Sequence, residues 1–244
     1  MDSIDTSSRI RNISCKYANR GYEFHLTSNL NWLRYLKQVE LLKKIIPPRS
    51  RVLDIGCGLG QTTALLASSC EDISIIGADI QKHHSWRELE DFGCEFCTCD
   101  ASSLPFISGS FEAIVSFGVM EHTSSDAGFL KEINRCLQNE GCNILFQLPN
   151  RYSLSECFGK GLGLWHHKRT YTEKNIYDLI EICGFKLKII SKEHIIPAQV
   201  GRISSILAKI FDNNHYTIYV LDRMLSKTPL AFFSQDYMII LEKK

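Results

Sequence analysis

Three glycines in one short segment constrain this chain more than any other feature. The segment VLDIGCGLGQT (52–62) begins as an apolar run, which predicts a buried strand, and continues into glycines at positions 56, 58 and 60. Glycine lacks a Cβ, so such a loop can take left-handed turns and let another group approach its backbone. The helical pattern that follows predicts the first unit of an α/β sheet.

The alternation of strand and helix patterns continues to about residue 150. Apolar runs that predict strands lie at 51–56, 73–80, 94–100, 111–118 and 142–150, and helical patterns lie at 61–70, 82–93 and 126–141. This alternation predicts an α/β fold with an open, mostly parallel sheet and helices on both faces. Ligands of such sheets bind beyond the carboxyl ends of the strands, so we expect the functional loops at that edge.

Patterns outside this region organise the rest of the chain. Apolar residues at helical spacing over 30–46, stopped by Pro47 and Pro48, predict an amphipathic helix. We assign residues 1–48 to an N-terminal helical cap and residues 49–244 to the main domain.

The alternation stops after Pro149. Residues 151–170 are rich in glycine, aromatic and basic residues and predict a lid-like loop, and 171–244 form a C-terminal, substrate-side half. Thr172 is the expected cap of a helix that ends at Gly184. The remaining patterns are a strand at 186–195, mostly helical residues at 200–226 and a strand at 231–244. These two strands bring the predicted sheet to seven.

Composition and charge exclude several classes of protein. The chain has 28 basic and 27 acidic residues, so nothing favours non-specific nucleic-acid binding. The N-terminal residues lack the apolar core of a signal peptide, and no apolar run approaches the roughly 20 residues that span a bilayer. We therefore expect a cytoplasmic protein. Its ten cysteines are expected to be reduced, and the cluster Cys94, Cys97 and Cys99 lacks a fourth nearby ligand, so we predict no metal site.

The spacing of the glycine loop narrows the choice of cofactor. A dinucleotide fingerprint would place its third glycine at position 61, where this chain has Gln61. A triphosphate loop would require a lysine that the segment lacks. An NAD-dependent oxidoreductase would share the predicted sheet, but the glycine spacing argues against it.

The loop resembles the first motif of class I S-adenosylmethionine (SAM) methyltransferases, in which a strand is followed by D-x-G-C-G-x-G. Further segments resemble later motifs of that family in the same order: GADI (77–80), CDASSLPF (99–106), SFEAIVSFGVMEH (110–122) and LKEINRCLQNEGCNILFQLPN (130–150). The resemblance covers about residues 50–150. It implies a Rossmann-like sheet and SAM as the cofactor.

The resemblance also implies which residues bind the cofactor. The glycine loop, with Cys57, would admit the methionine part, Asp54 would meet its ammonium group, and Asp79 would accept the ribose hydroxyls. Asp100 and the backbone N–H of Ala101 would bind adenine. The full predicted set is Asp54, Gly56, Cys57, Gly58, Gly60, Asp79, Ile80, Asp100, Ala101 and Phe117, with Leu104, Phe106 and Gly118 beside them.

Methyl transfer to a protonated oxygen or nitrogen needs a base, and histidines are the main candidates. His122 follows the fourth predicted strand, so we predict it as the base; the alternative is a histidine that only holds its loop by a hydrogen bond. His166 and His167 of the lid-like segment are expected to be exposed or to bind an anionic substrate. His83 and His84 are expected on the surface, at the start of a helix.

The methyl acceptor is less constrained. The segment LPNRYSLSE (148–156) and the helical pattern at 171–185 resemble methyltransferases of bacterial polysaccharide and secondary-metabolite pathways. This resemblance implies a small-molecule acceptor, with a hydroxyl on a sugar or metabolite. Quinone, lipid and tRNA methyltransferases and a non-catalytic SAM-binding module remain open. Residues 17–22 are expected to close over the cofactor.

Overall fold

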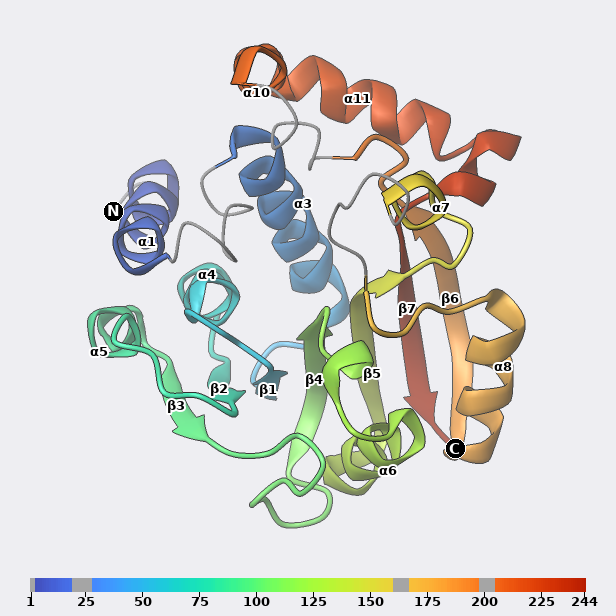
Figure 1. The fold of residues 1–244 in the computed structure, drawn as a ribbon. Coiled ribbons are helices and arrows are strands. Elements are labelled where there is room, and N and C mark those ends of the chain that lie inside the picture. The colour runs from blue at the N-terminus through green and yellow to red at the C-terminus, as the bar shows by residue number, and fades with distance from the viewer. Residues whose placement is uncertain (1–2, 19–27, 160–166, 198–204) are drawn as a thin grey trace.

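A computed structural model describes residues 3–18, 28–159, 167–197 and 205–244 (Figure 1). Its seven strands form one sheet in the order β3-β2-β1-β4-β5-β7-β6, and β7 alone runs against the others. The strands are β1 (Arg51–Ile55), β2 (Ser74–Asp79), β3 (Glu95–Thr98), β4 (Phe111–Phe117), β5 (Leu137–Pro149), β6 (Phe185–Glu193) and β7 (Asp236–Lys243). The predicted seven-strand, mostly parallel α/β fold is confirmed.

Helices cover both faces of this sheet. They are α1 (Ser3–Tyr17), α3 (Asn29–Ile45), α4 (Gln61–Ser69), α5 (Trp86–Leu89), α6 (Asp126–Cys136), α7 (Leu154–Gly159), α8 (Glu173–Ile182), α10 (Ser205–Asn213) and α11 (His215–Leu225). Short 3-10 turns form η1 (Glu90–Phe92), η2 (Met120–His122) and η3 (Pro229–Phe233). None of the helices in these described ranges is long and apolar enough to cross a membrane.

The buried core is divided by the sheet because successive strand side chains point to opposite faces. Val52 of β1 packs in a cluster with α3 and α4, whereas Leu53 packs in a second cluster with α6 and α8. In Figure 1, α10 and α11 lie across the top of the molecule, above α3. Both helices pack against α3.

Two predicted helices are shorter than expected. The helix predicted to run to Gly141 ends at Cys136, because Leu137 already pairs with Phe111 as the first residue of β5. The helix predicted from residue 82 begins only at Trp86, so His83 and His84 lie in the turn before it. In both places strand pairing or turn geometry overrides the helical pattern of the sequence.

Other boundaries agree closely with the sequence. The helix predicted at 30–46 is α3, and Thr172 caps α8 by accepting a hydrogen bond from the N–H of Asn175. Gly184 follows α8 with φ +75°, as a glycine after a helix commonly does. The lid-like segment begins with α7, and its residues 160–166 lie outside the described residues. The predicted strand at 231–244 starts only at Asp236, because residues 229–233 form η3.

Candidate functional site

The glycine loop is fixed to the carboxyl end of β2 by backbone hydrogen bonds. The N–H groups of Gly56 and Cys57 donate to the carbonyl of Ala78, at 2.7 and 3.1 Å. The N–H of Gly58 donates to a carboxylate oxygen of Asp79, at 2.9 Å. Asp79 therefore holds the loop, and the loop lies at the carboxyl edge of the sheet, as predicted.

The three glycines of the loop have different surroundings. All three have left-handed φ angles, between +52° and +86°. A Cβ added at Gly56 would come within 2.3 Å of Val119, and one added at Gly60 would come within 2.7 Å of Phe96. A Cβ at Gly58 would meet no atom within 4 Å. Gly56 and Gly60 thus make room for neighbouring side chains, and Gly58 leaves its backbone open to a ligand.

Two residues that the sequence analysis missed hold this loop from the other side. Trp86 donates its indole N–H to the carbonyl of Gly58, at 2.8 Å, and Ser85 donates its hydroxyl to the carbonyl of Leu59, at 2.7 Å. The Trp86 ring also stacks on Phe96, with centroids 5.1 Å apart. A tryptophan in the pattern SWRELEDF gives no sign in the sequence that it reaches back to the loop.

Asp54 lies behind the loop and is almost fully buried. Its carboxylate accepts a hydrogen bond from the hydroxyl of Thr63 on α4, at 2.7 Å. Burial raises the pKa of Asp54 to about 7, the Thr63 hydrogen bond opposes this, and the charge of Asp79 adds to it. Asp54 thus contacts the helix that follows the loop, and its predicted roles in organising the loop and in meeting a cofactor ammonium stay predictions.

A polar group from the N-terminal region joins the site. Tyr35 of α3 is buried, and its ring lies 6.0 Å from that of Phe117 at the end of β4. Burial raises the pKa of Tyr35 to about 12, and hydrogen bonds with Gln61 and Gln147 oppose this rise. The Oε1 atom of Gln61 is buried without a hydrogen-bond partner among the described residues. Gln147 has φ +57°, a strained conformation that is typical of functional sites.

The remaining predicted cofactor residues lie at the ends of β2 and β3. Asp79 accepts from the N–H of Gln81 with its second oxygen, at 3.0 Å, and Ile80 beside it is exposed. Asp100 is exposed and accepts from the N–H of Ser102, at 2.7 Å. Ala101, which follows Asp100, is partly buried against the core. Leu104 is buried and Phe106 is partly buried in the same cluster.

The loop after β4 carries two titratable residues side by side. Glu121 is buried, and its Oε2 atom has no hydrogen-bond partner among the described residues. Burial raises the pKa of Glu121 to about 7. The Nε2 atom of His122 lies 3.9 Å from Oε1 of Glu121, and the His122 side chain is 37% exposed. Burial and the positive charges of residues 167–169 lower the pKa of His122.

The lid-like segment meets this loop through Arg169. Arg169 donates to the backbone carbonyls of Met120 and Thr123, each at 2.6 Å, and forms an ion pair with Asp126 at 3.0 Å. Arg169 therefore positions the loop that carries Glu121 and His122. This contact joins residues far apart in the chain, and no sequence pattern marks it.

His167 is largely buried, so the expectation that it is exposed is wrong. Its binding of an anionic substrate stays a prediction. Its Nδ1 atom lies 2.7 Å from a carboxylate oxygen of Glu156 on α7, and both side chains are largely buried. Burial lowers the pKa of His167, but the Glu156 hydrogen bond and nearby carboxylates outweigh it and raise the pKa overall. His166 lies outside the described residues.

The cysteine cluster is part of β3 and its flanks. The thiol of Cys94 donates to the carbonyl of Leu89 and is buried in the hydrophobic core. Cys97 and Cys99 lie two residues apart, so they are on the same face of the strand. Both are partly buried against the hydrophobic core, and a hydrogen bond between the two thiols lowers the pKa of Cys97 to about 7.

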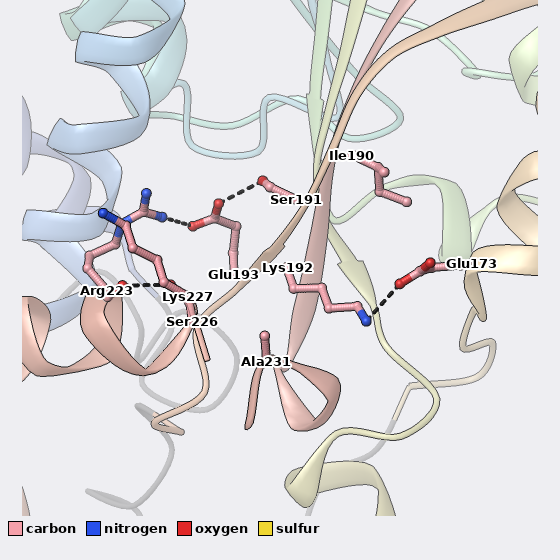
Figure 2. A pocket seen from close by; sticks show the side chains of 9 residues that line it. All are labelled: Glu173, Ile190, Ser191, Lys192, Glu193, Arg223, Ser226, Lys227 and Ala231. Carbon is pink, nitrogen blue, oxygen red and sulfur yellow. Dashed lines mark hydrogen bonds and ion pairs between the residues drawn. The ribbon is translucent and has the colours of Figure 1, made fainter. Parts of the chain in front are cut away.

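A cavity of about 350 Å³ lies at the β6 edge of the sheet, between β6, α11 and η3, whereas the glycine loop follows the inner strand β1. Figure 2 shows that four of its charged side chains form two pairs: Arg223 points to Glu193, and Lys192 points to Glu173. Lys227 also lines it. Because this cavity is formed by β6 at the sheet edge, we do not assign the cofactor to it.

Comparisons with known proteins agree with the geometry of the glycine loop. Residues 53–145 match the family model of the methyltransferase domain. The chain is 32% identical over 151 residues to the 2-methyl-6-phytyl-1,4-hydroquinone methyltransferase of Synechocystis sp., with 57% of this chain and 47% of that protein covered. It is 29% identical over 117 residues to the malonyl-acyl-carrier-protein O-methyltransferase of Legionella pneumophila, with 45% and 39% covered.

Solved structures share the fold over most of the chain. Phosphoethanolamine N-methyltransferase 2 of Haemonchus contortus, in complex with SAM, has a TM-score of 0.60 at 21% identity and covers 87% of this chain and 52% of its own. The cyclase SpnF has a TM-score of 0.59 at 17% identity, with 85% and 80% covered. Structural likeness at this level shows the fold alone, and the chain spans about half the length of the curated relatives it matches.

The matched domain, the order of the strands and the loop after β1 point to the same family. The methyltransferase model covers β1 to β5, the part of the sheet that carries the glycine loop and the ends of β2 and β4. Residues 53–145 therefore match a methyltransferase domain, and the chain as a whole shares the fold of a solved methyltransferase in complex with SAM.

Proposed function

We propose that this protein transfers a methyl group from SAM to a small-molecule acceptor, and that the acceptor atom is a hydroxyl oxygen. The observation that carries the proposal is the open backbone at Gly58, whose N–H donates to the carboxylate of Asp79. The buried carboxylate of Asp54 lies at the end of the strand before the loop. A ligand with an ammonium group and ribose hydroxyls complements two carboxylates next to an open loop.

The residues of the loop fit this cofactor. Each oxygen of Asp79 accepts one backbone N–H, so each keeps a lone pair for a ribose hydroxyl. A bound ammonium next to Asp54 would favour its ionised form and lower the pKa that burial has raised. The Oε1 atom of Gln61, which has no hydrogen-bond partner in the described part of the chain, is a further acceptor at the start of α4. When bound, SAM supplies a methyl group activated by the positive sulfonium.

The chain's own residues would align the reactants and accept the proton that the hydroxyl acceptor loses. His122 stands after β4, and its lowered pKa keeps the ring neutral at pH 7, so it can accept a proton from a hydroxyl acceptor. Glu121 is a second candidate base that the structure adds, because its buried Oε2 atom has no described partner. Tyr35 and Phe117 pack together and exclude water from the end of β4.

The proposal for the acceptor rests on less specific observations than the proposal for the cofactor. A hydroxyl on a sugar or a metabolite follows from the looser resemblance of residues 148–156. The relatives act on acceptors as different as a prenylated hydroquinone and a malonyl group on a carrier protein. They support methyl transfer in general, and the acceptor stays a proposal. The balanced charge of the chain gives no support to a tRNA acceptor.

Calorimetry with SAM, S-adenosylhomocysteine and NAD tests this function. We expect SAM to bind in the micromolar range, about −8 kcal/mol, and NAD not to bind. Gly58→Val should abolish SAM binding, because the new side chain fills the open space above the loop.

Gly109→Val is the matched control for Gly58→Val. Gly109 also has a left-handed φ, +70°, and a Cβ there would also meet nothing within 4 Å, so the backbone strain is similar. We expect Gly109→Val to bind SAM as the wild type does. A folded Gly58→Val protein with normal SAM affinity would contradict the proposed cofactor site.

A further inference from the structure

Helix α11 is held on one side and open on the other. On its inner side, Asp222 is buried and forms an ion pair with Arg34 of α3 at 2.8 Å. On its outer side, Tyr216, Val220 and Met224 recur at every fourth residue and are 64%, 39% and 63% exposed. Large apolar side chains at this spacing form a stripe along one side of the helix.

Neighbouring residues widen this stripe into a surface. Leu221 of α11 and Ile210 of α10 are each 48% exposed. We define the outer apolar face as the following five residues: Ile210, Tyr216, Val220, Leu221 and Met224. Further exposed apolar side chains follow in η3: Leu230, Phe232 and Phe233. So many large apolar side chains exposed on α11 and the elements next to it in the chain indicate a site of interaction.

The charges of these two helices are sorted between the inner and outer sides. Asp212 accepts a hydrogen bond from the N–H of Asn29 at 2.9 Å, and Asp222 is buried. The basic residues Lys209, Arg223 and Lys227 are all exposed.

The exposed basic residues border the apolar face. Arg223 lies seven residues after Tyr216, so the two share a side of α11. Lys227 lies in the turn that follows α11, which ends at Leu225. Arg223 pairs with Glu193, and Lys227 has no ion-pair partner in the described part of the chain. Lys227 also lines the cavity at the end of α11 (Figure 2). The outer side thus joins apolar surface to positive charge.

We infer that the outer apolar face binds to the surface of an anionic lipid membrane. Amphipathic helices with large apolar residues and basic neighbours lie in the lipid interface, where the apolar side is buried and the basic side chains contact anionic headgroups. A second copy of the chain fits this face less well. A two-fold contact would bring the same patch of both copies together, so that the exposed Lys209 and Lys227 of each copy gather in one interface, where like charges repel.

This surface is connected to the proposed cofactor site through α3. Arg34 holds α11, and the next residue, Tyr35, packs against Phe117 at the end of β4. The lipid surface would therefore lie beside the acceptor end of the site. On the basis of the proposed function, the acceptor is a hydroxyl compound with an apolar tail that resides in the lipid.

Co-sedimentation with vesicles tests the docking surface without an activity assay. We expect the purified chain to sediment with phosphatidylcholine vesicles that contain phosphatidylglycerol. Its affinity for vesicles of phosphatidylcholine alone should be at least about tenfold lower. Binding should weaken as salt is added. The double variant Tyr216→Glu/Met224→Glu should lose at least about tenfold in vesicle affinity, because it places two charges in the apolar face.

Ile182→Glu is the matched control, because Ile182 is 68% exposed on α8, outside the outer apolar face. It should sediment with vesicles as the wild type does, and both variants should keep the wild-type circular dichroism spectrum. SAM affinity, measured separately, should be unchanged in both, so failure of the cofactor proposal is distinguishable from failure of this one.

Three results would overturn the inference. The first is a wild-type chain that stays in the supernatant with phosphatidylglycerol vesicles. The second is an equal loss of binding in Ile182→Glu. The third is a dimer in sedimentation equilibrium that Tyr216→Glu/Met224→Glu converts to a monomer, which would make a second copy the occupant of the face.

Discussion

At the scale of single residues, the loop after β4 decides how the protein would handle a proton. His122 is partly exposed and has a lowered pKa, whereas Glu121 beside it is buried and has a pKa raised to about 7. Neighbouring residues therefore differ in both solvent access and basicity. Such pairs separate acid and base roles in enzymes.

We predict that His122 is the base. His122→Ala should slow methyl transfer by roughly 10²–10⁴-fold and keep SAM affinity. Because its pKa is lowered, the wild-type rate should fall only below about pH 6.5, and this acid limb should vanish in the variant. The measurement is a pH–rate profile with labelled SAM, after an acceptor has been found by screening.

Glu121→Gln and His167→Ala are the comparisons for this prediction. Both should retain a rate much closer to that of the wild type. If His122→Ala is as fast as the wild type and Glu121→Gln is slow, with an acid limb near pH 7, the base is Glu121 and the prediction is wrong. The same pattern at His167 would assign the base to the lid-like segment.

At the scale of elements, the contact between α3 and α11 joins a helix from the first quarter of the chain to one from its last quarter. Arg34 and Asp222 are almost completely buried, and Arg34 also donates to the carbonyl of Ile196 at 2.8 Å. Burial lowers the pKa of Arg34, and the charge of Asp222 opposes this. A buried pair is sensitive to the loss of either partner, because the other charge is then left uncompensated.

Arg34→Ala should therefore lower the free energy of unfolding by roughly 3–5 kcal/mol. Lys37→Ala is the control: it removes the exposed pair with Glu40 one turn further along α3 and should cost less than about 1 kcal/mol. Urea denaturation of both variants measures the difference. Similar midpoints for the two variants would show that the buried pair does not hold α11 in place.

At the scale of the whole molecule, two buried carboxyl groups link folding to pH. Burial raises the pKa of Asp54 and of Glu121 to about 7 in the folded state, whereas both titrate near pH 4 when unfolded. Between these values the folded protein holds more protons than the unfolded chain. Their contribution to stability is thus complete below about pH 4 and is lost as the pH rises through about 7.

We predict that the free energy of unfolding falls by a few kcal/mol between about pH 5 and pH 7.5. Asp54→Asn and Glu121→Gln should each flatten this fall, because an amide does not titrate. Glu112→Gln, at a partly exposed carboxylate with a lowered pKa, should leave it unchanged. Chemical denaturation at several pH values gives the slopes, and parallel curves for all four proteins would count against the role of burial.

The sequence by itself determined the order of strands and helices and the place of the glycine loop. These features depend on local patterns: the apolar period of a strand, the caps of a helix such as Thr172, and the absence of a side chain at Gly58. The same patterns overestimated two helices: pairing between β4 and β5 extends the strand back to Leu137, and a turn holds His83 and His84 before α5. Strand pairing is a contact between residues far apart in the chain, so local secondary-structure propensity cannot predict it.

Only the tertiary structure decided which side chains complete the site. Tyr35 arrives from the N-terminal region, Trp86 reaches back to the glycine loop, and Arg169 holds the loop after β4. Glu121 and His122 are adjacent in the chain, and only packing buries the first and leaves the second partly exposed. Burial and proximity are properties of the folded chain, and they set the pKa values on which the proposed chemistry depends.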